Sequence, residues 1–171
     1  TKPCICCHNA CFTMARYEGS ANDQDLFDAI HMARCALNPQ TMQSRKYRVK
    51  KAARQKHIAV IGGGIGGMES ALLLHARGHR VSLYKSARLG GVFIAAAAPS
   101  YKNKDRELID WYRRQIAQSG IEVHLNTEVR DIASLSADEI VISTGASPKR
   151  PPIPGVEHAM DATDFLSGAP T

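Results

Sequence analysis

The sequence has few acidic and few aromatic residues and no long apolar run. Sixteen acidic residues stand against 22 basic ones, aromatic side chains make up 6% of the chain, and there is a single tryptophan. No apolar run reaches the roughly 18 residues that a membrane-spanning helix needs. The first ten residues, "TKPCICCHNA", lack the basic and apolar regions of a secretory signal peptide. We therefore expect a soluble, cytoplasmic protein with no membrane partner.

The excess of basic residues gives a formal net charge of +6 and is concentrated in residues 45–56, "RKYRVKKAARQK". A basic stretch that includes an aromatic residue is one way to follow a nucleic acid backbone. No nucleic-acid-binding fold signature accompanies this segment. We interpret it as a solvated connector and expect no nucleic acid partner. Hydrophobic residues make up 44% of the chain, which is enough for a packed core.

The chain divides by composition into three segments. Residues 1–44 contain all five cysteines and one possible helix at 23–37, residues 45–56 form the connector, and residues 57–171 alternate between strands and helices. Short runs of β-branched residues predict strands at 57–62, 80–84, 121–126 and 139–144. Helical spacing of apolar residues predicts two helices. One lies at 66–77 with Met68, Ala71, Leu72 and Ala76 on one face, and the other lies at 104–119 with Leu108, Ile109, Tyr112 and Ile116 facing inward. Strands that alternate with helices predict an α/β domain with a parallel sheet.

A glycine fingerprint, G-x-G-x-x-G, opens the first predicted helix. It follows a predicted strand and precedes a second one, which is the context of a Rossmann-like dinucleotide-binding unit. The first glycine permits a tight turn, the second lets a pyrophosphate approach, and the third lets the helix pack on the sheet. Free N–H groups and the helix dipole would then bind the diphosphate. The candidate cofactor residues of this loop are Gly62, Gly63, Gly64, Gly66 and Gly67.

The end of the second predicted strand departs from this pattern. An acidic residue about 20 residues after the fingerprint usually binds the adenosine ribose. The sequence there is "LYKSARLGG", with Lys85 in that place. Four explanations stay open: the ribose is bound differently, the cation favours the 2′-phosphate of NADP(H), the cofactor is bound poorly, or Lys85 faces solvent. Lys85 and Arg88 are candidate cofactor contacts.

Four of the five cysteines lie within "CICCHNAC", residues 4–11. Cysteines in a cytoplasmic chain argue against a disulfide framework. Cys4, Cys7, Cys11 and the later Cys35 could supply four thiolates to zinc or to a [4Fe–4S] cluster. Structural zinc sites more often use two C-x2-C pairs, so three clustered cysteines and a remote one favour iron–sulfur over zinc. Cys6 and His8 are not assigned as ligands.

Taken together, these motifs resemble the C-terminal part of the 2,4-dienoyl-CoA reductase and trimethylamine dehydrogenase group. These are multidomain flavin oxidoreductases related to old yellow enzyme. The segments that carry the resemblance span nearly the whole chain in a fixed order: "KPCICCHNAC", "CALNP", "HIAVIGGGIGGMESALLLHARGHRVSLY", "LGG", "LNTEV", "IVISTGASPKRPPIPG" and "DFLSG".

The resemblance implies an electron-transfer role. In that family an N-terminal TIM barrel carries FMN and reduces the substrate, and electrons pass from NAD(P)H through FAD and a [4Fe–4S] cluster to FMN and an enoyl-type substrate. It implies a mostly irregular or helical iron–sulfur segment followed by an FAD-binding Rossmann-like domain. The implied partner is the FMN barrel, in the same polypeptide or in another chain. The isolated chain would be a catalytically incomplete fragment of an NAD(P)H-dependent oxidoreductase.

Several residues acquire roles only through the resemblance. The cluster ligands would be Cys4, Cys7, Cys11 and Cys35. Further cofactor contacts would be Gly90 and Gly91 of "LGG", Val129 of "LNTEV", and Thr144 and Gly145. No catalytic side chain is assigned, because the flavin and the cluster would carry the chemistry.

The sequence departs from this family in four ways. One residue, the family's glutamate after "LY", is missing. The interval between Cys11 and Cys35 is about twice the usual length, so residues 12–34 have the character of an insertion. The barrel is absent, and the chain ends at Thr171 before a second glycine fingerprint. Two other interpretations therefore stay open: an ADP- or NADP-binding module without redox activity, and a zinc-stabilised basic interaction domain.

Overall fold

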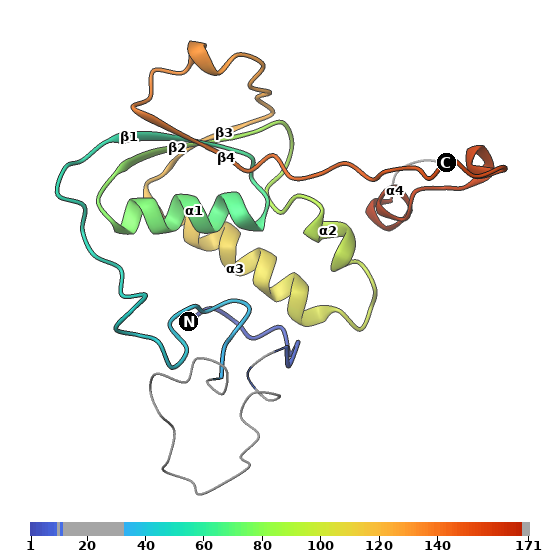
Figure 1. The fold of residues 1–171 in the computed structure, drawn as a ribbon, viewed down its shortest axis with the longest axis horizontal. Coiled ribbons are helices and arrows are strands. Elements are labelled where there is room, and N and C mark those ends of the chain that lie inside the picture. Colours follow the sequence, from blue (N-terminus) through green and yellow to red (C-terminus); the bar gives the residue numbers. More distant parts are fainter. Residues whose placement is uncertain (10, 12–32, 169–171) are drawn as a thin grey trace, which may run out of the picture. The chain divides into compact units, whose positions relative to one another are not determined.

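The computed structural model describes residues 1–9, 11 and 33–168. The chain falls into two compact units, Thr1–Lys50 and Lys51–Thr171 (Figure 1). The described residues of the first unit form turns but no helix or strand. Of the helix expected at 23–37, residues 23–32 lie outside the described residues, and residues 33–37 are not helical. The interval 12–34 lies outside the described residues except at its last two positions.

The second unit is built on a four-stranded parallel sheet. Its strands are β1 (His57–Ile61), β2 (Arg80–Lys85), β3 (Glu122–Leu125) and β4 (Glu139–Ile142). Their order in the sheet is β3-β2-β1-β4, and each neighbouring pair is parallel. The four predicted strands therefore exist with ends shifted by no more than two residues. The α/β fold class with a parallel sheet is confirmed.

Two long helices cover one face of this sheet. They are α1 (Ile65–Ala76) and α3 (Asn103–Ser119), and both lie on the same side of the strands in Figure 1. The residues expected to face inward from α3 are all buried: Leu108, Ile109, Tyr112 and Ile116. On α1 the expected face is buried only at Met68 and Ala71. α3 ends at Gly120, whose φ of 78° is the left-handed conformation that stops a helix.

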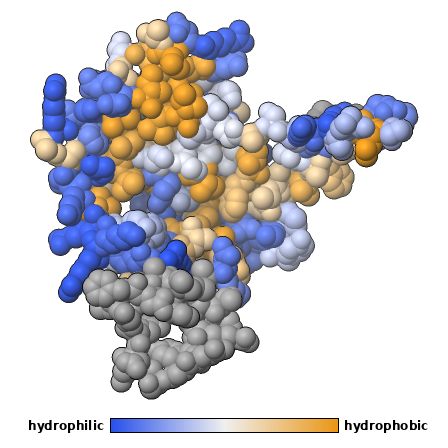
Figure 2. All heavy atoms as spheres, viewed as in Figure 1, coloured by the Kyte–Doolittle hydropathy of each residue, from blue (hydrophilic) through white to orange (hydrophobic). Residues whose placement is uncertain are grey.

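Shorter elements complete the unit. They are helices α2 (Phe93–Ala96) and α4 (Ala162–Ser167) and the 3-10 turns η1 (Ile132–Ser134) and η2 (Val156–His158). None of the helices in the described residues is long and apolar enough to span a membrane. Within the connector, residues 45–56, all residues but Ala52 and Lys56 are exposed. Hydrophilic side chains gather along the left edge of Figure 2.

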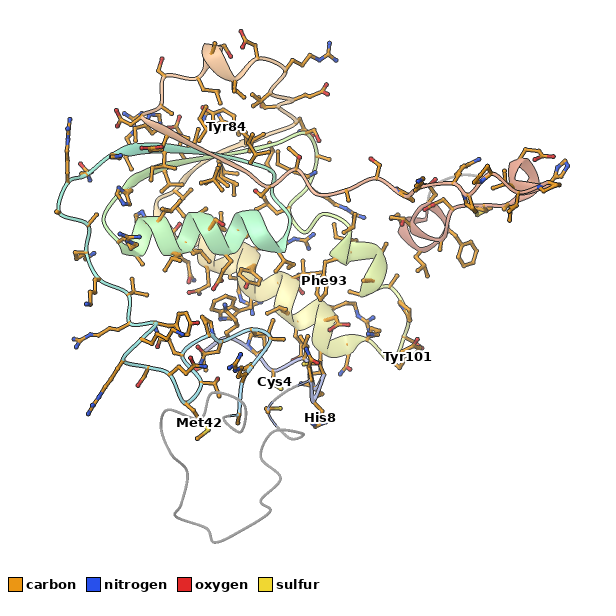
Figure 3. All side chains as sticks on the ribbon, viewed as in Figure 1. Cys4, His8, Met42, Tyr84, Phe93 and Tyr101 are labelled. Carbon is orange, nitrogen blue, oxygen red and sulfur yellow. The ribbon has the colours of Figure 1, made fainter. Side chains whose placement is uncertain are left out.

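A chain of polar side chains joins the strands. The ring nitrogen Nε2 of His57 lies 2.8 Å from Ser82 Oγ, and Ser82 Oγ donates to Glu122 Oε2 at 3.2 Å. The hydrogen bond from Ser82 is the main cause that lowers the pKa of Glu122. His124 stacks on Tyr84 with ring centroids 4.5 Å apart (Figure 3). These contacts tie β1, β2 and β3 together by side chains as well as by the backbone ladder.

A buried tyrosine between the two helices makes stability sensitive to alkali. Tyr112 is 2% exposed and donates a hydrogen bond to Glu69 Oε2 at 3.0 Å. Burial raises the pKa of Tyr112 well above its ordinary value, and the Glu69 carboxylate raises it further. The folded state therefore favours the protonated phenol, and this contribution is complete below the unfolded-state pKa of about 10.

We predict that the free energy of unfolding of the wild type falls toward that of Tyr112→Phe as the pH rises above about 10. The difference between the two free energies should decrease by at most about 1.4 kcal/mol per pH unit, the value for one proton. Urea unfolding between pH 8 and 11 measures it. A gap that stays constant over this range would contradict the prediction.

Candidate functional site

The first glycine loop lies where β1 ends and α1 begins. The N–H of Gly62 donates to the carbonyl oxygen of Tyr84 at 2.8 Å, which fixes the loop to the end of β2. Gly62 has a φ of 115°, and a methyl group there would overlap the carbonyl oxygen of Ser143. A methyl group at Gly67 would overlap the carbonyl oxygen of Gly62. These two glycines therefore serve the tight turn and the close packing of α1.

Gly64 and Gly66 of this loop face open space. A methyl group at Gly64 or at Gly66 would meet no atom within 4 Å. Gly64 is the N-cap of α1, forms no side-chain cap, and the first turn of the helix contains no acidic side chain. The start of α1 thus has N–H groups without a side-chain acceptor, at the positive end of the helix dipole. An anionic group could approach the backbone here.

A second glycine loop, Leu89–Gly90–Gly91, lies against the first. The N–H of Gly90 donates to the carbonyl oxygen of Gly63 at 2.8 Å. A methyl group at Gly91 would lie 3.0 Å from the Cα atom of Gly64. Gly90 and Gly91 have φ values of 126° and 58°, which side chains rarely adopt. The structure therefore brings the "LGG" residues together with the fingerprint.

Arg113 on α3 holds this second loop. Its guanidinium donates to the carbonyl oxygen of Leu89 twice, from Nε at 3.1 Å and from Nη2 at 2.7 Å. Sequence analysis did not single out this residue. It belongs to no motif, and its distance in sequence from "LGG" gives no sign of the contact.

The carboxyl end of β4 completes this edge of the sheet. The hydroxyl group of Ser143 bonds to the carbonyl oxygens of Ile61 at 3.1 Å and Gly62 at 3.2 Å. Thr144 and Gly145 follow and are exposed at the same edge. After β1 the chain continues to β2 and β3 on one side of β1, and β4 then lies on its other side. The carboxyl ends of β1 and β4 therefore mark the topological switch point of the sheet. In open α/β sheets, ligands bind outside the carboxyl ends of the strands at that point.

Lys85 lies at the same edge, as the last residue of β2. Its Cβ atom would be 3.1 Å from a methyl group at Gly63, so it stands beside the first glycine loop. Neither Lys85 nor Arg88 has a hydrogen bond or ion pair partner for its side chain within the described residues. Lys85 thus lies where the fold usually places a carboxylate for a ribose, and Arg88 is an exposed cation three residues further along the chain.

Val129 is less closely placed than the other candidates. It is half-buried and lies outside the helices and strands. The chain leading to it returns to this edge, because the N–H of Thr127 donates to the carbonyl oxygen of Lys85 at 3.0 Å. The structure thus directs the "LNTEV" segment toward the crevice but gives Val129 itself no hydrogen bond to either glycine loop among the described residues.

The cysteines have the chemistry of a cluster site but are not gathered into one. The N–H of Cys6 donates to Cys4 Sγ at 3.3 Å, and the N–H of Leu37 donates to Cys35 Sγ at 3.4 Å. Such N–H donors stabilise a thiolate and tune a cluster's potential. In the described residues, however, no three His, Cys, Asp or Glu side chains come close enough to hold a metal ion. Cys4 (labelled in Figure 3), Cys7 and Cys11 are exposed.

A lysine links the two cysteine segments within the first unit. Lys2 Nζ donates to the carbonyl oxygen of Leu37 at 3.1 Å. This hydrogen bond connects the residues before Cys4 to the residues after Cys35. The assignment of Cys4, Cys7, Cys11 and Cys35 as ligands stays a prediction, because the described residues do not bring three of these thiols together.

The comparisons with known proteins identify the family of the chain. The family model of the pyridine nucleotide-disulphide oxidoreductases matches residues 34–136. The chain belongs to this family. Membership confirms the oxidoreductase class expected from the sequence, and the matched region contains both glycine loops and Lys85.

Similar proteins include two curated oxidoreductases and one solved reductase structure. The chain is 33% identical to the cinnamate reductase of Clostridium sporogenes over 96% of its own length and 24% of that protein. It is 35% identical to the NADH oxidase of Thermoanaerobacter brockii over 79% of its own length and 22% of that protein. The solved structure of a 2-naphthoyl-CoA reductase is 32% identical, with a TM-score of 0.76 over 84% of this chain and 23% of that one. The resemblance is confirmed, and the chain spans about a quarter of the length of these relatives.

Proposed function

We propose that the chain is the electron-transfer part of a flavin and iron–sulfur oxidoreductase. Residues 57–171 would bind FAD, with its diphosphate at the two glycine loops. The observation that carries this proposal is that the uncapped start of α1, the open face of Gly64 and the "LGG" loop meet at the switch point of the sheet. The flavin would supply hydride and single-electron chemistry. The chain would bind and orient it.

Residues 1–44 would carry the cluster and residues 45–56 would connect the two parts. Cys4, Cys7, Cys11 and Cys35 would hold a [4Fe–4S] cluster, which passes single electrons when bound. The N–H donors on Cys4 Sγ and Cys35 Sγ support this choice, since they stabilise negative charge on ligand sulfurs. The complete enzyme would take electrons from NAD(P)H and deliver them to an FMN barrel. The name cinnamate reductase of one relative supports an enoyl-type substrate.

A visible absorption spectrum of the protein purified without oxygen tests this function. We expect a flavin band with a broad iron–sulfur shoulder, and both should bleach when dithionite is added. Protein that carries neither flavin nor iron, and that binds neither after reconstitution, would refute the proposal.

A second candidate function has a specific observation in its favour. Lys85 lies beside the first glycine loop, where FAD-binding domains of this type place an acidic residue, and its side chain has no partner among the described residues. Cations there suit the 2′-phosphate of NADP(H). On this alternative the chain is a module that binds ADP or NADP and has no redox activity of its own. Calorimetric titration with FAD, ADP, NAD⁺ and NADP⁺ distinguishes the two, because much tighter binding of FAD excludes the module.

Charge reversal at Lys85 should change the preference between nucleotides. If the cation contacts a 2′-phosphate, Lys85→Glu should weaken NADP⁺ binding by about 100-fold and change NAD⁺ binding by less than about threefold. This expectation combines the loss of an ion pair with added repulsion. If FAD is the ligand, Lys85→Glu should instead strengthen binding, because it restores a carboxylate for the ribose hydroxyls.

Arg77→Glu is the matched control for this experiment. Arg77 caps the opposite end of α1 and is exposed. Equal effects of both charge reversals on every nucleotide would show that Lys85 acts only through net charge.

A further inference from the structure

The second glycine loop has little to hold it in place by itself. Gly90 and Gly91 both adopt positive φ values, and glycine loses more conformational freedom on ordering than any other residue. A short parallel bridge between Gly64 and Gly90, which includes the hydrogen bond from the Gly90 N–H to the carbonyl oxygen of Gly63, joins it to the first loop. The Leu89 carbonyl lies outside this bridge, so its position depends on other contacts.

Arg113 supplies those contacts from a rigid element. Within the described chain it is the only residue whose side chain hydrogen-bonds residues 89–91. Its neighbours on α3, Ile109 and Tyr112, are 4% and 2% exposed, so the helix is anchored in the core. Two donors of one planar guanidinium converge on a single oxygen atom, which fixes the direction of the Leu89 carbonyl as well as its distance.

The loop that Arg113 fixes forms one wall of the crevice. The Leu89 side chain covers Gly63, since its Cδ2 atom would be 2.6 Å from a methyl group there. Gly91 faces the Cα atom of Gly64, the residue whose open face adjoins the start of α1. A movement of the Leu89 carbonyl would therefore change the space available in front of the N–H groups of α1.

We propose that Arg113 is a positioning residue for the nucleotide diphosphate: it holds Leu89–Gly91 so that the two glycine loops form a preordered crevice. It acts through the loop and does not itself touch the ligand. The inference rests on the proposed nucleotide site but holds equally for FAD and NADP(H), because both contain an ADP unit. Preordering raises affinity, because the bound nucleotide then orders less of the protein.

Titration of the full chain with ADP, followed by calorimetry, tests this role. We expect Arg113→Ala to weaken ADP binding about 10-fold, the effect of losing one charge-assisted pair of hydrogen bonds. Arg113→Lys, which keeps the charge and one donor, should weaken it about threefold. The control is Arg114→Ala, an exposed arginine at the next position of α3, which should stay within a factor of two of the wild type.

Melting temperatures measured on the same samples separate positioning from general stability. A lower melting temperature with an unchanged ADP dissociation constant in Arg113→Ala would overturn the proposal and leave the nucleotide site intact. If Arg113→Ala does not fold, the same criterion applies to Arg113→Lys. A wild-type protein that does not bind ADP would instead refute the proposed site, and this role would fall with it.

Discussion

Gly67→Ala is expected to cause a large loss of stability, because among the described glycines it would bring a new Cβ atom closest to a backbone atom. The new Cβ atom would overlap the carbonyl oxygen of Gly62, and that oxygen belongs to a turn that Ser143 holds from the other side. Relief of the overlap requires α1 to move away from the end of β1, which would open the core around Met68, a residue that is 0% exposed. We expect a destabilisation of about 3 kcal/mol or more, at the upper end of overpacking costs, measured by urea unfolding.

Gly66→Ala is the matched control in the same turn of helix. The added methyl group would meet no atom within 4 Å, and alanine favours a helix over glycine by about 1 kcal/mol. Gly66→Ala should therefore be neutral or more stable than the wild type. If the two variants unfold at the same urea concentration, then the packing role of Gly67 is wrong. Weaker nucleotide binding by a stable Gly66→Ala protein would show that its open face adjoins the ligand.

Removal of one predicted cluster ligand should remove the cluster. A serine at Cys4 or Cys35 replaces a thiolate by a hydroxyl group, which is a poor ligand for iron at neutral pH. For each variant we expect iron in anaerobically purified protein to fall from about four atoms per chain to near zero. The visible shoulder should vanish, while the flavin band should remain, because the nucleotide crevice lies in the other compact unit.

Cys6→Ser provides the control for these variants. Cys6 is exposed, its φ is 55°, and the predicted ligand set does not include it. Its N–H group, which donates to Cys4 Sγ, survives the substitution. Full iron content in Cys6→Ser with loss in the other two variants would support the assignment. Loss of iron in Cys6→Ser would place Cys6 in the ligand set, and one zinc per chain without iron would favour a zinc-stabilised interaction domain.

Periodicity and glycine chemistry predicted the nucleotide-binding unit well. The run at 57–62 is short, apolar and bounded by glycine, so it could only form a buried strand, and the spacing of Leu108, Tyr112 and Ile116 matches a helix face that is buried in the structure. α1 was less predictable. Its sequence is apolar on most sides, so the periodicity did not distinguish the buried Met68 and Ala71 from the exposed Ala76.

The contacts that hold the site could not be predicted from the sequence. Arg113 and the hydroxyl group of Ser143 both bind carbonyl oxygens, which every residue has, so no motif identifies the partner. In the cysteine segment, a sequence pattern was present but the described structure shows no matching contacts. Spacing there made Cys4, Cys7, Cys11 and Cys35 candidates for zinc or a cluster, and only the family resemblance assigned them as cluster ligands. The described structure does not bring them into one group, so the site stays a prediction.

The open faces of Gly64 and Gly66 imply that affinity and selectivity for a nucleotide would come from different parts of the proposed site. The surface offered to a ligand at the start of α1 is main chain, and main-chain groups are the same whatever the residue. Such a surface would bind the groups that all adenine dinucleotides share and would not distinguish one dinucleotide from another. Selectivity between nucleotides would then depend on the edge of the proposed site, where Lys85 is the last residue of β2. A protein built this way could exchange one nucleotide for another through a single substitution at its edge, with the helix, the turn and the core unchanged.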